Sequence, residues 1–394
     1  MPPDGALPAA FAARIGQRPF SVYVHVPYCA SRCGYCDFNT YTASELGGGA
    51  SQAGYPKDAI GEVGFARKVL GDAELPVRTV FFGGGTPTLL PVPDLAAILA
   101  AIDGEFGLAA DAEVTTEANP ESVDAASLQA LREAGFTRIS FGMQSARPHV
   151  LAVLDRRHTP GAAMRRVAEA KAAGFEHVSL DLIYGTPGES DDDWRASLDA
   201  AIAAEPDHIS AYSLIVEDGT RLAARIARGE LPRPLDDVLA DRYLIADDAL
   251  SAAGYEWYEV SNWARPGGEC RHNLAYWRSD DWWGVGPGAH SHVGGVRWWN
   301  VKHPTAYAAR IADGVSPGQA RECLDVETQR FERVMLQLRL ADGLDLGELL
   351  GGPGIAEQEV ADGLLDAQAL SGGRAVLTTQ GRLLADGVAR RLLA

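Results

Sequence analysis

The chain has 394 residues, 46% of them apolar, and a formal net charge of −18. This length predicts one large domain with one or two smaller units. The acidic balance disfavours nucleic acids and anionic membrane surfaces as partners. No apolar run is long enough to form a transmembrane segment, and residues 1–18 lack the parts of an export signal. Five cysteines in such a chain predict a cytoplasmic protein with metal chemistry rather than disulfides.

The first predicted strand, Phe20–Val26, follows a loose tail at residues 1–17. The loop after Pro27 carries three cysteines in C-x3-C-x2-C spacing: Cys29, Cys33 and Cys36. A [4Fe–4S] cluster normally takes four cysteines, so three would leave one iron open to a reactive ligand. The spacing alone also allows a zinc site completed by His25 or His272, or ordinary buried thiols.

A glycine-rich turn follows the second predicted strand, Val77–Phe82. Before this strand, residues 43–55 contain three consecutive glycines and predict a flexible connection into a helix that ends near Leu70. The turn, Gly83-Gly-Gly-Thr-Pro87, lacks the Gly-Lys-Ser/Thr ending of a P-loop. Its glycines would let the backbone approach a ligand, although a tight turn between strand and helix is the simpler explanation.

The alternation of strand and helix then repeats. After a helix from about Pro93, strands are predicted at 112–117, 138–142, 177–184 and 208–215, and helices at 122–134, 162–173 and 191–204. Regular alternation predicts parallel strands with right-handed crossovers. A closed TIM barrel has eight such units, so six predict an α/β fold with an open (β/α)6 partial barrel over residues 18–234. A doubly wound sheet is the alternative.

Glycine, polar and aromatic residues that could serve chemistry fall near the C-terminal ends of these strands: Cys29, Gly84, Glu117, Gln144, Asp181 and Tyr212. In parallel α/β folds this face carries the active site. The sequence therefore predicts that these positions surround one site.

Residues 235–320 predict a helix at 235–253 followed by an aromatic-rich connecting region. Seven of the eight tryptophans lie between Trp257 and Trp299, around the motif His272-Asn-x-x-Tyr-Trp277. One histidine among aromatic rings is what an axial haem ligand in an apolar pocket needs. Aromatic stripes are more often core, however, and His272 could equally be a hydrogen-bonded structural histidine.

Residues 321–394 predict a smaller helical domain that starts its helices at about Thr328. A short wing strand at Arg374–Thr379 beside two helices gives it a winged-helix-like pattern. Its many acidic residues make DNA binding improbable, so we expect a docking or dimerising module.

The first strand and its three cysteines resemble the radical S-adenosylmethionine (SAM) superfamily. The segments Thr-Thr-Glu117-Ala-Asn-Pro, Gln144 to Arg156 and Asp181-Leu-Ile-Tyr-Gly-Thr-Pro resemble its oxygen-independent coproporphyrinogen III oxidase branch. The resemblance implies the partial barrel, a [4Fe–4S] cluster on the three cysteines, and SAM chelating the open iron. It also implies SAM contacts at Tyr23, Gly84, Gly85, Thr86, Glu117, Gln144, Arg156 and Asp181. Tyr35 would pack on the adenine or shield the cluster from water.

Two departures argue against porphyrinogen decarboxylation, which stays the alternative function. Phe38 stands where the oxidase has a fourth cysteine, and only 28 residues precede Cys29. The His-Asn-x-x-Tyr-Trp motif instead resembles the haem chaperones of this branch, as does the segment Glu332–Gly343. That resemblance implies haem bound by His272, transfer to apo-haem proteins such as respiratory cytochromes, and a homodimer. It assigns no role to Cys270, Cys323, His290 or His292.

Overall fold

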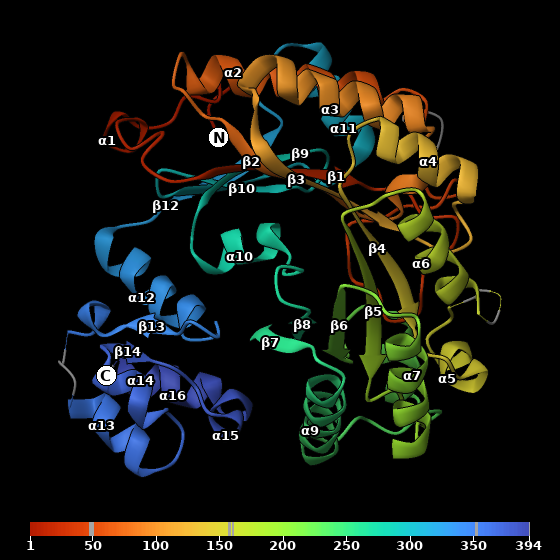
Figure 1. The fold of residues 1–394 in the computed structure, drawn as a ribbon. Coiled ribbons are helices and arrows are strands. Elements are labelled where there is room, and N and C mark those ends of the chain that lie inside the picture. Colours follow the sequence, from red (N-terminus) through yellow and green to blue (C-terminus); the bar gives the residue numbers. More distant parts are fainter. Residues whose placement is uncertain (47–50, 157–158, 160, 351–353, 394) are drawn as a thin grey trace.

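The computed structural model describes residues 1–46, 51–156, 159, 161–350 and 354–393. Six parallel strands form the expected open barrel (Figure 1): β1 Phe20–Val26, β2 Val77–Gly84, β3 Leu108–Ala118, β4 Arg138–Gln144, β5 His177–Tyr184 and β6 His208–Ser213. The predicted fold class is confirmed. The glycine run predicted to be flexible, 47–50, lies outside the described residues.

Helices cover the outer face of these strands: α2 Tyr55–Leu70, α3 Val92–Phe106, α4 Ala125–Glu133, α5 Pro148–Val153, α6 Ala162–Ala172, α7 Asp191–Ala203 and α9 Asp236–Ala252. Helix α8, Arg221–Ala227, instead lies at the cysteine loop, where the amide of Leu222 donates to the carbonyl of Gly34 at 2.8 Å. A short 3-10 helix, η1 Pro87–Leu89, precedes α3. Capping boxes begin two of them, because Asp124 and Ser190 each exchange hydrogen bonds with the residue three positions later. The outward side chains form the main core, so the inside of the barrel is left for polar residues.

The aromatic-rich region adds strands to both edges of the barrel sheet. On one edge β9 Asp281–Val285 pairs parallel to β1 and is followed by β10 His290–Val293, β11 Val296–Asn300 and β12 Gly318–Cys323. On the other edge β8 Asn262–Ala264 pairs with β6, and β7 Glu256–Glu259 is outermost. The result is one twelve-stranded sheet. These strands were not predicted, since they are short and the two that join the barrel sheet, β9 and β8, pair with strands far away in sequence.

Helix α10, Arg271–Trp277, joins the two edges and lies against the inner side of the barrel (Figure 1). Helix α11, Pro304–Ala312, packs on α2. The N-terminal residues contact the same sheet extension: the carbonyl of Pro3 accepts from the amide of Ser316 at 2.7 Å. The short helix α1, Ala9–Ala12, belongs to this segment.

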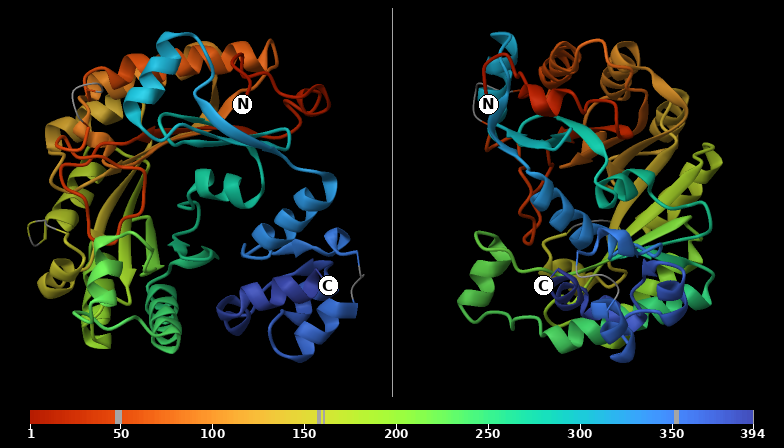
Figure 2. Two further views of the ribbon diagram at one scale, coloured as in Figure 1. Left: turned by 180° about the vertical axis from the view of Figure 1, so that it is seen from behind. Right: turned by 90° about the vertical axis from the view of Figure 1, so that its left-hand side faces the viewer.

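The C-terminal elements form their own small core beside the barrel (Figure 2): α12 Val326–Gln337, β13 Leu344–Asp345, η2 Leu346–Glu348, α13 Gly354–Ala361, α14 Ala367–Ser371, β14 Arg374–Ala375, α15 Thr379–Leu383 and α16 Ala385–Leu392. Strands β13 and β14 pair antiparallel, and β14 begins at the predicted wing strand. The predicted helical C-terminal region is thus confirmed.

Candidate functional site

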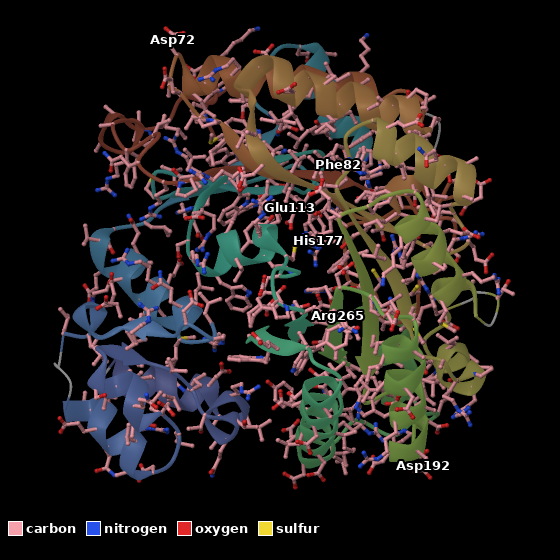
Figure 3. The ribbon with its side chains drawn as sticks, in the orientation of Figure 1. Asp72, Phe82, Glu113, His177, Asp192 and Arg265 are labelled. Carbon is pink, nitrogen blue, oxygen red and sulfur yellow. The ribbon has the colours of Figure 1, made fainter. Side chains whose placement is uncertain are left out.

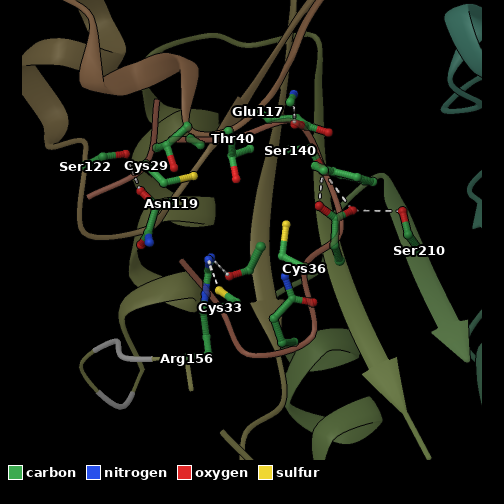
Figure 4. Close-up of a pocket in the computed structure, with 18 of the residues that line it drawn as sticks. Cys29, Cys33, Cys36, Thr40, Glu117, Asn119, Ser122, Ser140, Arg156 and Ser210 are labelled. Carbon is green, nitrogen blue, oxygen red and sulfur yellow. Dashed lines mark hydrogen bonds between the residues drawn. The ribbon is translucent and has the colours of Figure 1, made fainter. Parts of the chain in front are cut away.

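A cavity of about 570 Å³ lies inside the barrel, where the strands end. All but two of the predicted site residues line it: Cys29, Cys33, Tyr35, Cys36, Gly84, Gly85, Thr86, Glu117, Gln144, Arg156 and Asp181. Figure 4 shows the three cysteines on the loop after β1, with Arg156 close to Cys33. The loop and the strand ends therefore converge on one space.

Main-chain hydrogen bonds fix the start of the cysteine loop. The amide of Cys29 donates to the carbonyl of Tyr41 at 3.0 Å, and the amide of Thr86 donates to the carbonyl of Tyr28 at 2.7 Å. The first bond closes the base of the loop, and the second ties it to the turn after β2. Cys29 and the glycine turn are consequently held side by side.

Two glycines of that turn are required by close contacts. A Cβ on Gly85 would meet the carbonyl oxygen of Tyr28 at 2.4 Å. Gly84 has φ of +104°, and a Cβ there would meet the ring of His25 at 2.5 Å. The turn therefore presents bare backbone to the cavity, as a site for a polar ligand would require.

The three thiols of the loop line the cavity. Within the described parts of the chain, no three His, Cys, Asp or Glu side chains converge closely enough to hold one ion. In a [4Fe–4S] cluster each cysteine binds its own iron, so the thiolates stand further apart. Burial, and then the neighbouring Cys36, raises the pKa of Cys29 to about 11. A bound metal would reverse that effect and hold the thiolates.

The zinc alternative loses one of its proposed fourth ligands. The ring of His25 is engaged at both nitrogens, with Nδ1 2.9 Å from the hydroxyl of Tyr23 and Nε2 2.9 Å from the carbonyl oxygen of Asn39. Burial lowers the pKa of His25. Its role is thus to support the turn at Gly84 from behind.

Tyr35 covers the cysteine loop with an apolar surface. Its ring lines the cavity and also packs against a small cluster of Leu154, Ile183, Leu214 and Leu222. This position keeps water from one side of the thiols, and the exposure of a cluster to solvent tunes its potential.

Two half-buried carboxylates, Glu117 and Asp181, face the same cavity. Oε2 of Glu117 accepts from the amide of Gly84 at 3.1 Å, and Asp181 accepts from the hydroxyls of Ser140 and Ser210 at 3.0 and 2.9 Å. Burial, and then the charge of Asp181, raises the pKa of Glu117 to about 8. Glu117 is therefore neutral in the ligand-free protein at pH 7, and a cationic ligand would favour its ionised form.

Gln144 and Arg156 also line the cavity. Gln144 adopts a φ of +66° at the end of β4, a strained conformation for a residue with a Cβ. The guanidinium of Arg156 donates to the carbonyl of Gly142 at 2.9 Å and lies 3.8 Å from the sulfur of Cys33. The arginine thus brings a positive charge to the thiol that it contacts.

Tyr23 and His272 do not line the cavity but lie together beside it. Their ring centroids are 6.4 Å apart, and the ring of Phe81 stacks on that of His272 at 5.1 Å. Inward-facing side chains of β1 and β2 therefore separate His272 from the cluster loop.

Both ring nitrogens of His272 have partners. Thr79 donates to Ser21, so its oxygen accepts the proton of Nδ1 of His272, 2.7 Å away. Nε2 then carries the lone pair, and the hydroxyl of Tyr276 donates to it at 2.9 Å. Burial lowers the pKa of His272 to about 3, so the ring is neutral. His272 is neutral, as a metal ligand must be. The lone pair on Nε2 that would bind a metal accepts the hydrogen bond from Tyr276 instead.

Comparison with known proteins gives the family. A family model described as Radical SAM superfamily matches residues 23–201. A protein of Mycobacterium tuberculosis named Heme chaperone HemW is 55% identical over 381 residues, which cover 95% of each chain. This chain belongs to the HemW family. The Escherichia coli protein of the same name is 35% identical, over 89% of this chain and 90% of its own.

A solved structure shows the same fold. The coproporphyrinogen III oxidase HemN from Escherichia coli, described as a radical SAM enzyme, aligns with a TM-score of 0.81 over 97% of this chain and 92% of its own. At 23% identity this match establishes the fold alone. Over the described residues, no helix has the length and apolar content to cross a membrane.

The other residues of the His-Asn-x-x-Tyr-Trp motif hold α10 in place in this HemW-family chain. Asn273 and Trp277 hydrogen-bond to Glu259, whose pKa is raised to about 7 by burial. The amide of His272 donates to the carboxylate of Glu113 at 3.1 Å, and Figure 3 labels Glu113 close to α10. The motif thus fixes the position of α10, whether or not it also binds a ligand.

Several cavity residues were missed by the sequence analysis: Thr115, Arg138, Ser140, Ser179, His208 and Ser210. They are polar residues at every second position of β3 to β6, between apolar residues that face the helices. That alternation was the available signal. Of the unassigned residues, Cys270 lines the cavity, Cys323 is exposed on β12, and His290 and His292 lie on β10.

Proposed function

We propose that this chain is a haem chaperone that carries a SAM-bound [4Fe–4S] cluster and passes haem to apo-haem proteins. The observation that carries the proposal is its 55% identity, over 95% of its length, to a relative named a haem chaperone. We take the recipients to be proteins such as respiratory cytochromes, and homodimer formation remains a prediction.

The cavity supports the cofactor assignment. Cys29, Cys33 and Cys36 would hold the cluster, which when bound supplies one-electron reducing power to SAM. The backbone at Gly84, Gly85 and Thr86, with the side chains of Tyr35, Glu117, Gln144, Arg156 and Asp181, would hold SAM. Tyr23 would act indirectly, through the hydrogen bond to His25 behind the glycine turn.

His272 is our proposed haem ligand. The hydrogen bond from Nδ1 to Thr79 fixes the tautomer and the ring plane, as supporting bonds do for metal-binding histidines. Because Tyr276 occupies Nε2 and the ring is only 1% exposed, haem binding requires Tyr276 and α10 to move away. The His272 site is therefore closed in this conformation.

A haem titration of the cluster-reconstituted protein tests the proposal. The wild type should form a stoichiometric complex with a distinct haem absorption band, and His272→Ala should lose it. His290→Ala is the matched control, since His290 is an exposed histidine on β10. Equal haem binding by His272→Ala and the wild type would reject His272 as the ligand.

Radical decarboxylation of coproporphyrinogen III is the second candidate, favoured by the fold shared with HemN. Against it, the exposed Phe38 occupies the position where the oxidase has a further cysteine. We expect no carbon dioxide and no 5′-deoxyadenosine from reduced protein, SAM and coproporphyrinogen III. Stoichiometric formation of both products would establish the enzyme instead.

A further inference from the structure

Deep in the barrel, four polar residues on consecutive strands form a continuous row. Thr115 on β3 is the register partner of Arg138 on β4, and Ser179 on β5 is the register partner of His208 on β6. A guanidinium nitrogen of Arg138 donates to the hydroxyl of Ser179 at 3.0 Å, which links the two pairs. All four line the cavity and are at most 2% exposed. We call these four residues the deep belt.

The tautomer of His208 follows from its neighbour. The amide of Cys270 donates to the hydroxyl oxygen of Tyr258 at 3.3 Å, so the hydroxyl proton is free to point to Nε2 of His208, 2.8 Å away. Burial, and then the charge of Arg138, lowers the pKa of His208 well below its usual value, so the ring is neutral. Its single proton therefore lies on Nδ1, the ring nitrogen that does not bond to Tyr258.

Two atoms of the deep belt lack partners. Neither Nδ1 of His208 nor the hydroxyl oxygen of Thr115 has a hydrogen-bond partner within the described chain. Ser179 accepts from Arg138, which leaves its own proton for another acceptor. Buried polar groups are nearly always paired, so these donors point to an absent acceptor.

The charged groups next to the deep belt, Arg138, Glu113 and Asp181, have partners of their own. Arg138 lies 3.7 Å from Glu113, whose carboxylate accepts from the amide of His272. Asp181, toward the cluster loop, is turned to the hydroxyls of Ser140 and Ser210. No carboxylate of these residues reaches the two unpartnered donors, while a guanidinium stands between them in the row.

We propose that the deep belt binds the carboxylate of a small organic ligand that occupies the cavity in addition to SAM. A carboxylate offers acceptor sites on two oxygens and no donor, which matches three neutral donors next to Arg138. Two belt residues, Thr115 and Ser179, come two positions before Glu117 and Asp181 on their strands. The belt is therefore further than these carboxylates from the strand ends, where the cysteines would anchor SAM. The proposal does not depend on haem binding and would survive the failure of His272 as a haem ligand.

The test uses propionate as the probe, with propionamide as its neutral counterpart. Binding is followed by ligand-detected NMR on cluster-reconstituted protein with saturating SAM. Wild type should bind propionate saturably at one site, and propionamide about tenfold more weakly. Thr115→Val should weaken propionate binding about tenfold, the effect of one lost charge-assisted hydrogen bond. Thr115→Ser, which keeps the hydroxyl, should bind like the wild type.

Thr116→Val is the matched control. Thr116 is equally buried on the same strand, but its hydroxyl bonds to the carbonyl of Glu117 and its side chain does not line the cavity. Propionate affinity should stay within about twofold of the wild type in this variant. Absence of saturable binding, equal affinity in Thr115→Val, or displacement of propionate by SAM would each overturn the proposal.

Discussion

The hydroxyl of Tyr276 donates to the imidazole nitrogen that a haem iron would need. Removing this hydroxyl frees Nε2 of His272 while leaving the aromatic ring in place. A net hydrogen bond is worth about 1 kcal/mol, so Tyr276→Phe should raise haem affinity about fivefold in the same titration. Thr79→Val should lower the affinity, because Thr79 fixes the ring through Nδ1. Weaker haem binding by Tyr276→Phe would argue against coordination through Nε2.

Glu117 provides a pH-dependent stability that can be isolated by one substitution. Its pKa of about 8 in the fold lies above its usual 4.5, so the folded protein binds the proton more tightly than the unfolded chain. The resulting stability is complete below pH 4.5 and is lost as the pH rises through 8. One such proton changes the free energy of unfolding by at most about 1.4 kcal/mol per pH unit.

Comparison with Glu117→Gln removes the contribution of other buried acids. Between pH 6 and pH 8 the cluster-free wild type should lose about 2 kcal/mol more unfolding free energy than the variant, measured in urea. Parallel pH profiles of the two proteins would show that Glu117 is already ionised at pH 6.

At the scale of elements, α10 depends on the carboxylate of Glu113. This side chain accepts from the amides of Arg271 and His272 at the start of the helix and pairs with the buried Arg138. Glu113→Gln should lower the unfolding free energy by about 3 kcal/mol, because it leaves the guanidinium buried without its counter-charge. Thermal unfolding measures the loss.

Asp111→Asn is the control for Glu113→Gln. Asp111 pairs with Arg271 on the surface, so its loss should cost less than about 1 kcal/mol. Equal effects of the two substitutions would show that the buried carboxylate does not hold the helix.

The six barrel strands could be predicted because they alternate regularly with helices along the chain. Strand β9 could not, since it is short and its partner β1 lies about 260 residues earlier in the sequence. The strand ends predicted which residues line the cavity, because parallel strands bring their C-termini together. The burial of His272 was not predictable, because the motif alone cannot show that Tyr276 and Thr79 occupy both ring nitrogens.

At the scale of the whole molecule, Arg382 joins the C-terminal elements to the barrel. Its guanidinium pairs with Asp247 on α9 at 3.0 Å, contacts the hydroxyl of Tyr243 at 3.3 Å, and lies 4.3 Å from the ring centroid of Trp257. Asp247 also accepts from Trp263, so the arginine is the charge that balances a largely buried carboxylate.

Arg382→Ala should therefore loosen the C-terminal elements without affecting the cluster site. We expect the free energy of unfolding to fall by about 2 kcal/mol. This is less than for a fully buried ion pair, because both side chains keep some exposure to solvent. Limited proteolysis should cut near residue 325, between β12 and α12, much faster than in the wild type. Arg132→Ala, which breaks an exposed ion pair with Glu176, should change neither the free energy of unfolding nor the rate of proteolysis. Unaltered proteolysis of Arg382→Ala would mean that apolar contacts alone hold the two parts together.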